Sequence, residues 1–574
     1  MTRCSVQIPE ILLGRYQKGW VLAVICCLAV ISGYSQKKAA PVAPASKAVG
    51  KKAADLPVVL SWGDKLEVPK HHLPMAFWGS PKAGYLLVFS NGNKSIVIKQ
   101  FDAGMHGAGS NTIPLDMMPS AFENETFITL KKKVYWLYSN WEKESAVERV
   151  YAREVDQVHL KVGPELLLLQ TQHKLDRSPL EAPKPVAGIS VASNPAYGTH
   201  KYQFVLSSDS SKLLVRYRLK NSDKPNGKGI ETDGMFLFDE NLKHLSGDEY
   251  ALPYSSDRMT VEECRISQTE NIYLLAKIYE SSLKDATDKG SVPFHYEVIR
   301  YASGSKKADP SPLHLEQGVI KNVHLMEMGR EDLVCTGFYS ADAGGPVKGV
   351  YLVKLNPLLR EFTSYRKGYY EFPPEVKKVV APAKKGAAGP KKEVETGLAD
   401  LEFRDFLMHP DGSITITGEE QRITLDTLGG SHERPEVSQV FHYNNLMAMH
   451  IDSSGNVAWI KKIAKHQRGK NAGGDLSCKW VACGNQVAAF FLDDSRNSKL
   501  KAEQVPAPYV DGSGGIFVCE RLDEKGKDTR TVVFDTKLIK QTVIPLELFQ
   551  ASGNTLIATA AQDEVKTFYL LELR

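Results

Sequence analysis

Asp411-Gly412-Ser413-Ile414-Thr415-Ile416-Thr417 is the stretch that decides the fold. A polar turn containing glycine is followed by alternating apolar and polar residues, which is the pattern of a strand with one buried face. Ser453-Ser454-Gly455-Asn456-Val457-Ala458-Trp459-Ile460 repeats this unit. Asn91-Gly92-Asn93 is a further turn between apolar runs, and Asn-Gly is a strong hairpin signal because both residues tolerate a positive φ. The chain is therefore predicted to be a series of short antiparallel strands.

Many further segments show strand-like patterns, and each is predicted to be a strand. The principal predicted strands are 85–90, 95–98, 126–130, 133–137, 148–155, 201–206, 212–219, 234–239, 272–278, 295–301, 333–339, 349–355, 402–408, 413–417, 439–451, 457–462, 486–492, 515–519, 531–534, 555–559 and 566–573. With weaker segments included the total reaches about 25 to 28 strands, and four strands make one propeller blade. The sequence therefore predicts an all-β fold, a β-propeller of about six to seven four-stranded blades, with eight as the upper count.

Helical periodicity is nearly absent from the chain. Single helical turns are expected only at 281–289 and at 356–361, where Asn356 would cap the turn and Pro357 would take its first position. One closed propeller accounts for the strand-rich region better than three sandwiches, which would need linkers between them.

The first 36 residues have the pattern of a secretory signal peptide. Arg3, Arg15 and Lys18 supply positive charge before the apolar run 20–31, which is shorter than the roughly 20 residues of a membrane span. Small and polar residues follow the run, as a cleavage site requires. An uncleaved N-terminal anchor is the alternative interpretation.

Two tracts rich in Lys, Ala and Pro contain too few large apolar residues to fold. Residues 37–55 are predicted to be a disordered linker. Residues 377–397 are either a domain boundary or a loop within one domain; a disordered loop is predicted, because the same kind of strand pattern flanks them on both sides. The expected organisation is a signal peptide (1–36), a linker (37–55) and a propeller (56–574).

The charge balance is nearly neutral. The whole chain carries a net +5, of which the signal contributes +2, so the exported part carries about +3. A nucleic-acid-binding protein usually has a strongly basic face, so no nucleic-acid partner is expected. No second apolar run is long enough for a membrane span, and the mature chain is predicted to have no transmembrane segment.

The cysteines do not form a disulfide framework. Five follow the signal: Cys264, Cys335, Cys478, Cys483 and Cys519. An odd number cannot be fully paired, and the two in 478–483 would lie on opposite faces of a strand about 16 Å apart, beyond the reach of a disulfide. Most are predicted to be small buried apolar residues.

Five segments carry a family resemblance: 336–340 (TGFYS), 347–351 (VKGVY), 443–451 (YNNLMAMHI), 455–467 (GNVAWIKKIAKHQ) and 488–494 (AAFFLDD). Together they resemble a group of uncharacterised secreted β-propeller-like proteins of Bacteroidetes bacteria, over roughly residues 330–500. Ala464 departs from the Pro expected there. The resemblance implies export and a β architecture, and it implies no reaction. Asp426-Thr427-Leu428 also resembles the O-glycosylation acceptor of such bacteria, although three-residue matches often arise by chance.

No motif in the chain supports a catalytic, cofactor or metal site. His432-Glu433-Arg434-Pro435-Glu436 begins like a zinc-protease helix but lacks the second His, and its Pro opposes a helix. His71-His72 would point to opposite faces of a strand. Ser513, in Asp511-Gly512-Ser513-Gly514-Gly515, lies in a loop and not at a nucleophile elbow. Asp493-Asp494 offers oxygen ligands without the spacing of a calcium loop, so a solvated turn is predicted.

One aromatic cluster invites comparison with sugar-stacking platforms. Strand alternation puts Tyr135 and Leu137 on one face and Trp136 and Tyr138 on the other, so most of these rings are predicted to be core. Trp141, in the polar turn 139–142, is the predicted surface ring. Trp141 is therefore the candidate ligand contact.

These features favour an exported, non-enzymatic binding or scaffold propeller that is periplasmic or associated with the cell envelope and binds a protein or glycan partner. One alternative is a propeller hydrolase or lyase acting on polysaccharide, which needs acids or a His to converge from different blades. Another is an accessory subunit of an envelope or secretion assembly. No separate sorting domain follows the last predicted strand, which favours periplasmic residence.

Overall fold

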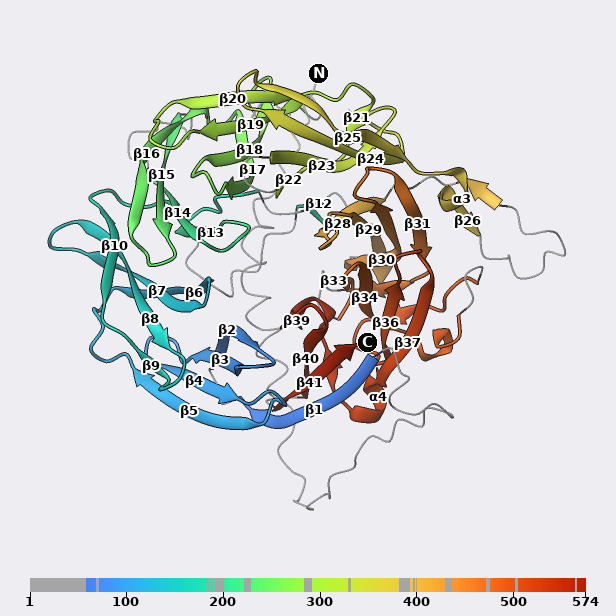
Figure 1. Ribbon diagram of the computed structural model, residues 1–574, viewed down its shortest axis with the longest axis horizontal. Coiled ribbons are helices and arrows are strands. Elements are labelled where there is room, and N and C mark those ends of the chain that lie inside the picture. The colour runs from blue at the N-terminus through green and yellow to red at the C-terminus, as the bar shows by residue number, and fades with distance from the viewer. Residues whose placement is uncertain are drawn as a thin grey trace, which may run out of the picture. The chain divides into compact units, whose positions relative to one another are not determined.

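Strands make up almost all of the regular structure in the computed structural model, and they form a ring of eight sheets (Figure 1). The structure describes residues 58–68, 72–182, 185–186, 189–190, 201–220, 229–282, 292–328, 332–380, 393–395, 398, 400–428, 436–470, 475–500, 504–562 and 565–574. The fold is therefore an all-β propeller. Its eight blades equal the upper count predicted from the sequence.

We number the blades in chain order. Blade 1 is β2 (Leu73–Ser80), β3 (Gly84–Ser90), β4 (Ser95–Phe101) and β5 (Gly107–Pro114); blade 2 is β6 (Phe122–Leu130), β7 (Lys133–Glu142), β8 (Val147–Asp156) and β10 (Leu166–Thr171), with β9 (Lys161–Val162) beside β8. Blade 3 is β13 (Tyr202–Leu206), β14 (Lys212–Arg218), β15 (Ile230–Asp239) and β16 (His244–Ser255); blade 4 is β17 (Met259–Ile266), β18 (Ile272–Tyr279), β19 (Phe294–Tyr301) and β20 (Ala308–Leu313).

The second half of the ring continues the pattern. Blade 5 is β21 (Val319–Ile320), β22 (His324–Met328), β23 (Asp332–Ser340), β24 (Val347–Asn356) and β25 (Glu361–Glu371); blade 6 is β28 (Leu401–Met408), β29 (Ile414–Leu428), β30 (Glu436–Ile451), β31 (Val457–Ile463), β32 (Gln467–Gly469) and β35 (Tyr509–Val510). Blade 7 is β33 (Cys478–Cys483), β34 (Gln486–Asp493), β36 (Ile516–Leu522) and β37 (Asp528–Asp535); blade 8 is β38 (Thr542–Val543), β39 (Phe549–Gln550), β40 (Thr555–Gln562), β41 (Val565–Leu573) and β1 (Val58–Glu67).

Short elements lie between the blades. Two ribbons are formed by β11 (Pro185–Val186) with β12 (Ile189–Ser190) and by β26 (Lys378–Val380) with β27 (Glu393–Glu395). The helical elements are α3 (Pro374–Lys377), α4 (Thr536–Ile539), and the 3-10 turns η5 (Ser495–Asn497) and η6 (Pro545–Glu547). None of these helices, in the part of the chain that is described, has the length and apolarity that a membrane span requires.

The ring is closed by pairing the first strand with the last. β1 runs antiparallel to β41, with Val58 opposite Leu573 and Glu67 opposite Val565. Blade 8 therefore takes its outermost strand from the N-terminal side of the propeller and its other strands from the C-terminal side (Figure 1). This closure covers the edge that β41 would otherwise expose.

The glycine turns that open the strand units have a common geometry. In 409–413 and 452–456 the first residue donates its N–H to the carbonyl of the fifth, and Gly412 and Gly455 have φ of 81° and 85°. A positive φ at this position is easy for glycine and costly for most other residues. The same turn in blade 4 places Glu270 at φ 67°.

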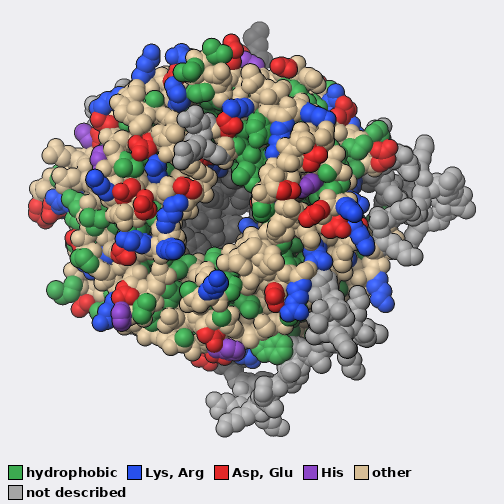
Figure 2. Space-filling view, in the orientation of Figure 1, with side chains coloured by type: hydrophobic (Ala, Val, Ile, Leu, Met, Phe, Trp, Pro, Cys, Tyr) green, Lys and Arg blue, Asp and Glu red, His purple; other side chains and the backbone are tan. Residues whose placement is uncertain are grey.

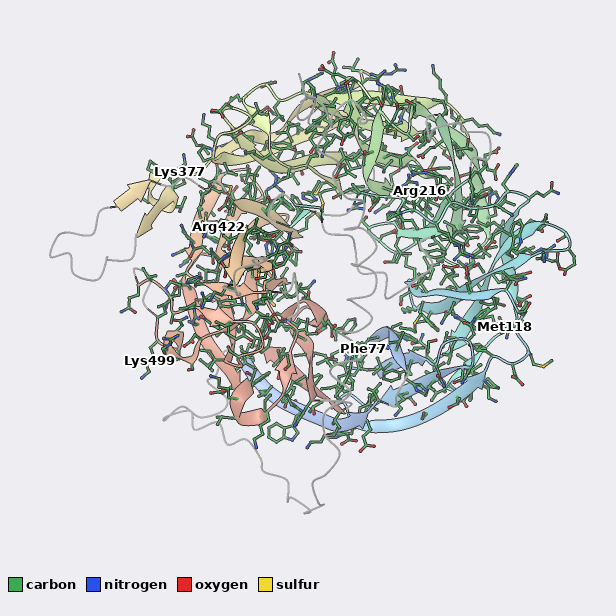
Figure 3. The ribbon with its side chains drawn as sticks, turned by 180° about the vertical axis from the view of Figure 1, so that it is seen from behind. Phe77, Met118, Arg216, Lys377, Arg422 and Lys499 are labelled. Carbon is green, nitrogen blue, oxygen red and sulfur yellow. The ribbon has the colours of Figure 1, made fainter. Side chains whose placement is uncertain are left out.

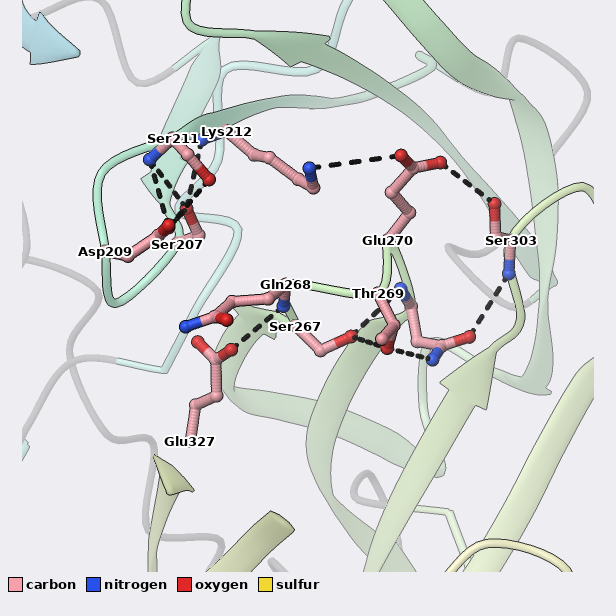
Figure 4. A network of polar contacts seen from close by, with 11 residues as sticks. Ser207, Asp209, Ser211, Lys212, Ser267, Gln268, Thr269, Glu270, Ser303 and Glu327 are labelled. Atoms are coloured by element: carbon pink, nitrogen blue, oxygen red, sulfur yellow. Dashed lines mark hydrogen bonds and ion pairs between the residues drawn. The ribbon is translucent and has the colours of Figure 1, made fainter. Parts of the chain in front are cut away.

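The antiparallel order gives each blade two different ends. The turn between the second and third strands lies at the same end as the link to the next blade, and we name this side of the ring the connection face. The turns between first and second strands lie on the opposite side. Figure 4 shows these opposite turns at blades 3 to 5, where Lys212 Nζ lies 3.9 Å from Glu270 Oε1 and the Gln268 N–H donates to Glu327 Oε1 at 2.9 Å.

The core lies between neighbouring blades. The alternation predicted in β7 is confirmed: Tyr135 and Leu137 pack in the core cluster toward blade 3, whereas Trp136 and Tyr138 pack in the cluster toward blade 1. All four side chains are buried. The four cysteines at 264, 335, 478 and 519 are buried free thiols, and Cys483 is a half-buried one, as predicted.

Three segments between the main strands carry predictions other than a strand. The ends of the tract 377–397 pair as β26 and β27, while most of its middle lies outside the described residues. Asn356 caps as predicted, since its Oδ1 accepts the N–H groups of Leu358 and Leu359, but the turn stops at Arg360 (φ 57°) and no helix forms. Most of 281–289 is also outside the described residues.

Candidate functional site

Polar residues of blade 2 meet the start of blade 3 on the connection face. Glu123 and Glu125 lie on β6, Ser139 near the end of β7 and Glu148 at the start of β8. Lys201 directly precedes β13. The ladder between β6 and β7 has a bulge between Asn124 and Thr126, which makes Glu125 the extra residue. A bulge re-aims a side chain, and here it directs a second carboxylate into the junction.

The Lys201 ammonium is the centre of this cluster. Its side chain is only 4% exposed, and Nζ donates to Ser139 Oγ at 2.9 Å and to Glu148 Oε1 at 2.8 Å. It also forms an ion pair with Glu123 and lies 3.8 Å from Glu125 Oε1. Three carboxylates from two strands therefore surround one buried cation, an arrangement that we name the Lys201 cluster.

Further donors hold the carboxylates in place. The Ser139 hydroxyl donates to Glu125 at 2.6 Å, and the Tyr202 hydroxyl donates to Glu148 at 3.2 Å. Arg177, which is 59% exposed, donates from Nη2 to Glu123 at 2.7 Å. Pairing of this kind is needed because a buried charge without a partner is costly.

The electrostatics distinguish the rim of the cluster, which we define as Glu123 and the exposed Arg177, from its buried interior. Burial opposes ionisation of Glu123, but hydrogen bonds and charge from Lys201 and Arg177 outweigh it and lower the pKa of this carboxyl. Burial first, and then Glu148, raise the pKa of the Tyr202 hydroxyl far above its usual range. Glu123 therefore stays ionised at the rim, and Tyr202 stays a neutral donor.

The buried half of the cluster is similar to the polar contacts that join other pairs of neighbouring blades. Between blades 4 and 5, Glu263 Oε1 lies 2.7 Å from His324 Nδ1, and its other oxygen accepts the N–H of Leu325 at 3.1 Å. Between blades 6 and 7, Arg404 donates to Ser477 Oγ at 2.6 Å. Lys201 and the carboxylates at 125 and 148 thus have a structural task, and the exposed rim is the part that can meet a ligand.

Trp141 stands next to this rim. It lies within β7, opposite Glu148, so the prediction of a turn over 139–142 is wrong; Ser139 and Asn140 are buried and the strand continues to Glu142. Cross-strand partners share a face, so the indole is on the same side as Glu148. The ring is half-buried, and Lys174 Nζ lies 6.0 Å from its centroid. Trp141 therefore offers a partly exposed ring beside charged groups of both signs.

A second candidate lies between blades 8 and 1. A cavity of about 290 Å³ is lined by Met75, Phe77, Phe549 and Phe568, among others. The Phe77 and Phe549 ring centroids are 4.8 Å apart in an edge-on arrangement. Phe77 is labelled in Figure 3 on β2, the first strand of blade 1, near the inside of the ring. We name this cavity the phenylalanine pocket, and it suits an apolar group.

The remaining motifs do not assemble into a site. Asp493 is fully buried against Arg530 and Asn497, so the predicted solvated turn is wrong for this residue; burial raises its pKa. Asp494 instead caps η5 and pairs with Arg496. Ser513 lies in a turn, as predicted, with its hydroxyl donating to the Gly514 carbonyl. No group of three or more His, Cys, Asp or Glu side chains in the described ranges is arranged to hold a metal ion.

Three other sequence motifs fall at or beyond the described ranges. Asp426 is exposed on β29, whose last residues 426–428 pair with 436–438 of β30. His72 is half-buried just before β2, and its neighbour His71 is not among the described residues. The segment 432–435 is likewise outside them.

No local pattern in the sequence marks the Lys201 cluster. Ser139 and Glu148 are 62 and 53 positions from Lys201 along the chain. Only the blade arrangement brings these three residues together. Trp141 could be predicted as a surface ring because an aromatic residue in a polar segment is a local pattern.

Figure 2 shows one face of the ring, on which acidic and basic side chains are interspersed.

No protein-family model matches the chain, and none of the curated proteins matches it. Solved structures that are similar include the β-propeller domain of the trilobed protease from Pyrococcus furiosus, at 11% identity and a TM-score of 0.31, covering 81% of this chain and 96% of that one. The WD40 domain of SCAP from fission yeast gives 9% identity and a TM-score of 0.34, covering 89% and 98%. A PL25 ulvan lyase gives 9% identity and a TM-score of 0.33, covering 77% and 90%.

Proposed function

We propose that this protein is an exported, non-enzymatic binding or scaffold propeller of the cell envelope that holds a glycan or protein partner on its connection face. The observation that carries the proposal is Trp141, a half-buried ring beside the exposed rim formed by Glu123 and Arg177. An aromatic face with flanking charged donors and acceptors suits a sugar ring or a polar peptide, because the ring packs while the polar groups fix orientation.

Export to the periplasm or envelope is part of the same proposal, and it rests on the signal-like pattern of residues 1–36. Expression of the full chain in a bacterium that secretes through such signals tests it. Cleavage near residue 36 with recovery in the periplasmic fraction supports export. Retention of the intact N-terminus in the cytosol refutes it.

The binding test combines an open search with a matched pair of variants. The tagged protein is purified from its native host and co-purifying proteins are identified by mass spectrometry, and the same preparation is applied to a glycan array. Trp141→Ala is expected to weaken any partner found by about 2 kcal/mol, roughly thirtyfold, as for a central aromatic contact. Trp62→Ala is the control, since Trp62 is 46% exposed on β1 in blade 8. Equal loss in both variants contradicts a site at Trp141.

A polysaccharide hydrolase or lyase is the second candidate, because Glu123, Glu125 and Glu148 lie together around Lys201, although all three come from blade 2 and not from different blades. Glycosidases use a pair of carboxyl groups, one of which must hold a proton. A screen of acidic and neutral polysaccharides with the wild type and with Glu123→Gln, the most exposed of the three carboxylates, decides between the candidates once denaturant unfolding shows that the variant folds. Turnover that this substitution abolishes establishes the enzyme, and binding without turnover supports the binding protein.

An accessory subunit of an envelope or secretion assembly is the third candidate, favoured by the phenylalanine pocket. A stoichiometric envelope protein that co-purifies with the wild type and is lost with Phe549→Ala would support it. A partner retained by that variant would place the contact elsewhere.

A further inference from the structure

The hairpin of β29 and β30 extends beyond the rest of blade 6. β28 pairs with β29 only as far as Glu420, whereas β29 and β30 stay paired to Leu428 and Glu436. The short strand β32 lies along the other side of β30 in this extension, opposite 441–443. One face of the extension packs into the core through Phe441 and Tyr443. The opposite face, which we name the free face, lies outside that core cluster and carries mostly polar residues, with Val440 as a buried apolar one.

Three basic side chains form a row across the free face. Arg422 on β29 is directly opposite His442 on β30, and His442 is directly opposite Arg468 on β32. Cross-strand partners project to the same face and neighbouring strands are about 4.8 Å apart, so the three side chains span roughly 10 Å. Both arginines are exposed and His442 is half-buried. Figure 3 labels Arg422 within this part of blade 6.

The row lacks compensating charge. In the described part of the chain, neither Arg422 nor Arg468 has an ion pair, although most other arginines there do. His466 and the exposed Lys470 add basic groups nearby, and the charge of Asp426 acts on His442 in the opposite direction. Like charges directly opposite one another destabilise a sheet. A row of this kind is stabilised by an anion that binds across it.

His442 is suited to the same role. Its Nε2 lies 2.9 Å from the Thr424 hydroxyl, which can donate to it and leave the ring proton on Nδ1. Burial first, and then the charges of Arg422, His466 and Arg468, lower the pKa of this imidazole. An anion between the two guanidinium groups would offset the positive charges that lower the pKa of His442. Anion binding and protonation of His442 therefore favour each other.

We propose that Arg422, His442 and Arg468 form a binding site for an oxyanion group of a ligand: a sulfate ester, a phosphate or a carboxylate. Guanidinium groups bind such groups through paired N–H donors, and two of them separated by an imidazole suit a planar or tetrahedral oxyanion better than single lysines would. The site is distinct from the Trp141 rim, and it does not depend on the function proposed for that rim. This oxyanion site implies an acidic partner, although the net charge of the whole chain is only slightly positive.

Titration calorimetry of the purified chain tests this site. Three polymers carry the three groups: heparin for sulfate, polyphosphate for phosphate and polygalacturonate for carboxylate, each at low salt, about 50 mM, because screening weakens exposed charges. The double variant R422Q/R468Q is expected to bind the preferred polymer at least a hundredfold more weakly, about tenfold for each charge-assisted contact. The rank order of the three polymers identifies the source of the oxyanion.

Matched controls separate this site from general attraction. Arg496→Gln and Arg360→Gln remove exposed guanidinium groups that are already in ion pairs, so they should leave the affinity within about twofold. Arg422→Lys keeps the charge but not the paired donors and should give an intermediate loss even if the double variant folds poorly. The proposal is overturned if all three polymers fail to bind, or if the control variants lose as much affinity as R422Q/R468Q.

Discussion

Glu520 on β36 is a buried acid whose replacement should make the propeller more stable in mildly alkaline solution. Its side chain is 6% exposed, and Arg530 Nη1 lies 3.3 Å from it. The same arginine also pairs with the fully buried Asp493, so one cation serves two acids. Burial first, and then the acids at 528 and 493, raise the pKa of Glu520 from 4.5 to about 7 in spite of Arg530.

The sign and size of the effect follow from this shift. The folded protein binds this proton more tightly than the unfolded chain does, so the resulting stability is fully present below pH 4.5 and is lost as the pH rises through 7. At 1.36 kcal/mol for each pKa unit, the loss is about 3 kcal/mol. Glu520→Gln keeps the shape and stays neutral at all pH values. The variant should therefore be about 2 to 3 kcal/mol more stable than the wild type at pH 8 and should differ from it by about 1 kcal/mol or less at pH 5.

Urea unfolding followed by tryptophan fluorescence at several pH values between 5 and 8 measures the difference. Asp493 has a pKa raised in the same direction, so some pH dependence should remain in the variant. Glu524→Gln, an exposed neighbour in the next turn, is the control and should change stability by no more than about 0.5 kcal/mol. If Glu520→Gln is no more stable than the wild type at pH 8, the account of this buried cluster is wrong.

Three further predictions concern other blades. Lys201→Met should lower stability by about 3 to 5 kcal/mol, because carboxylates are left buried without a cation. Adding Glu148→Gln should recover part of the loss, and denaturant unfolding measures both changes. Gly234→Ala should lower the free energy of unfolding by about 1 to 3 kcal/mol, because its new Cβ would lie 2.1 Å from the ring of Tyr217. Gly553→Ala is the control and should be neutral, because no atom lies within 4 Å of its new Cβ. Thermal unfolding compares the two variants. A chain that lacks β1 should expose the edge of β41 and associate, which light scattering after gel filtration would detect; a monodisperse monomer would contradict it.

The strands that could be predicted from sequence are those in the middle of each blade. β3 is buried along its whole length, and β34 is nearly so, and both were predicted almost to their ends. Such strands are apolar throughout because both faces are covered by neighbouring blades. Within the blades, all but one of the strands missing from the prediction are at an inner or outer edge. β5 is an example, with mostly exposed residues and only weak alternation. Missing edge strands led to a lower blade count.

The candidate site was predictable only where a local pattern carries it. Trp141 is visible as a ring among polar residues, but its place on a strand was not, since Ser139 and Asn140 are buried polar residues. The Lys201 cluster depends on contacts between blades and on a bulge at Asn124, neither of which leaves a periodic trace in the sequence. The basic row of blade 6 depends on register, which a one-residue slip would destroy.

The pairing of β1 with β41 also sets the order in which the molecule can be built. Glu67 and Val565 are partners separated by about 500 residues, and at roughly 5 to 20 residues per second synthesis of the part between them takes about 25 to 100 seconds. Throughout this interval the first strand lacks β41 as a partner, while blades 1 to 5 can each form from contiguous chain and blades 6 and 7 form together, because β35 of blade 6 lies between β34 and β36 of blade 7. The ring can therefore close only after the last strand has been made, and a chain truncated before that strand cannot form the pairing of β1 with β41.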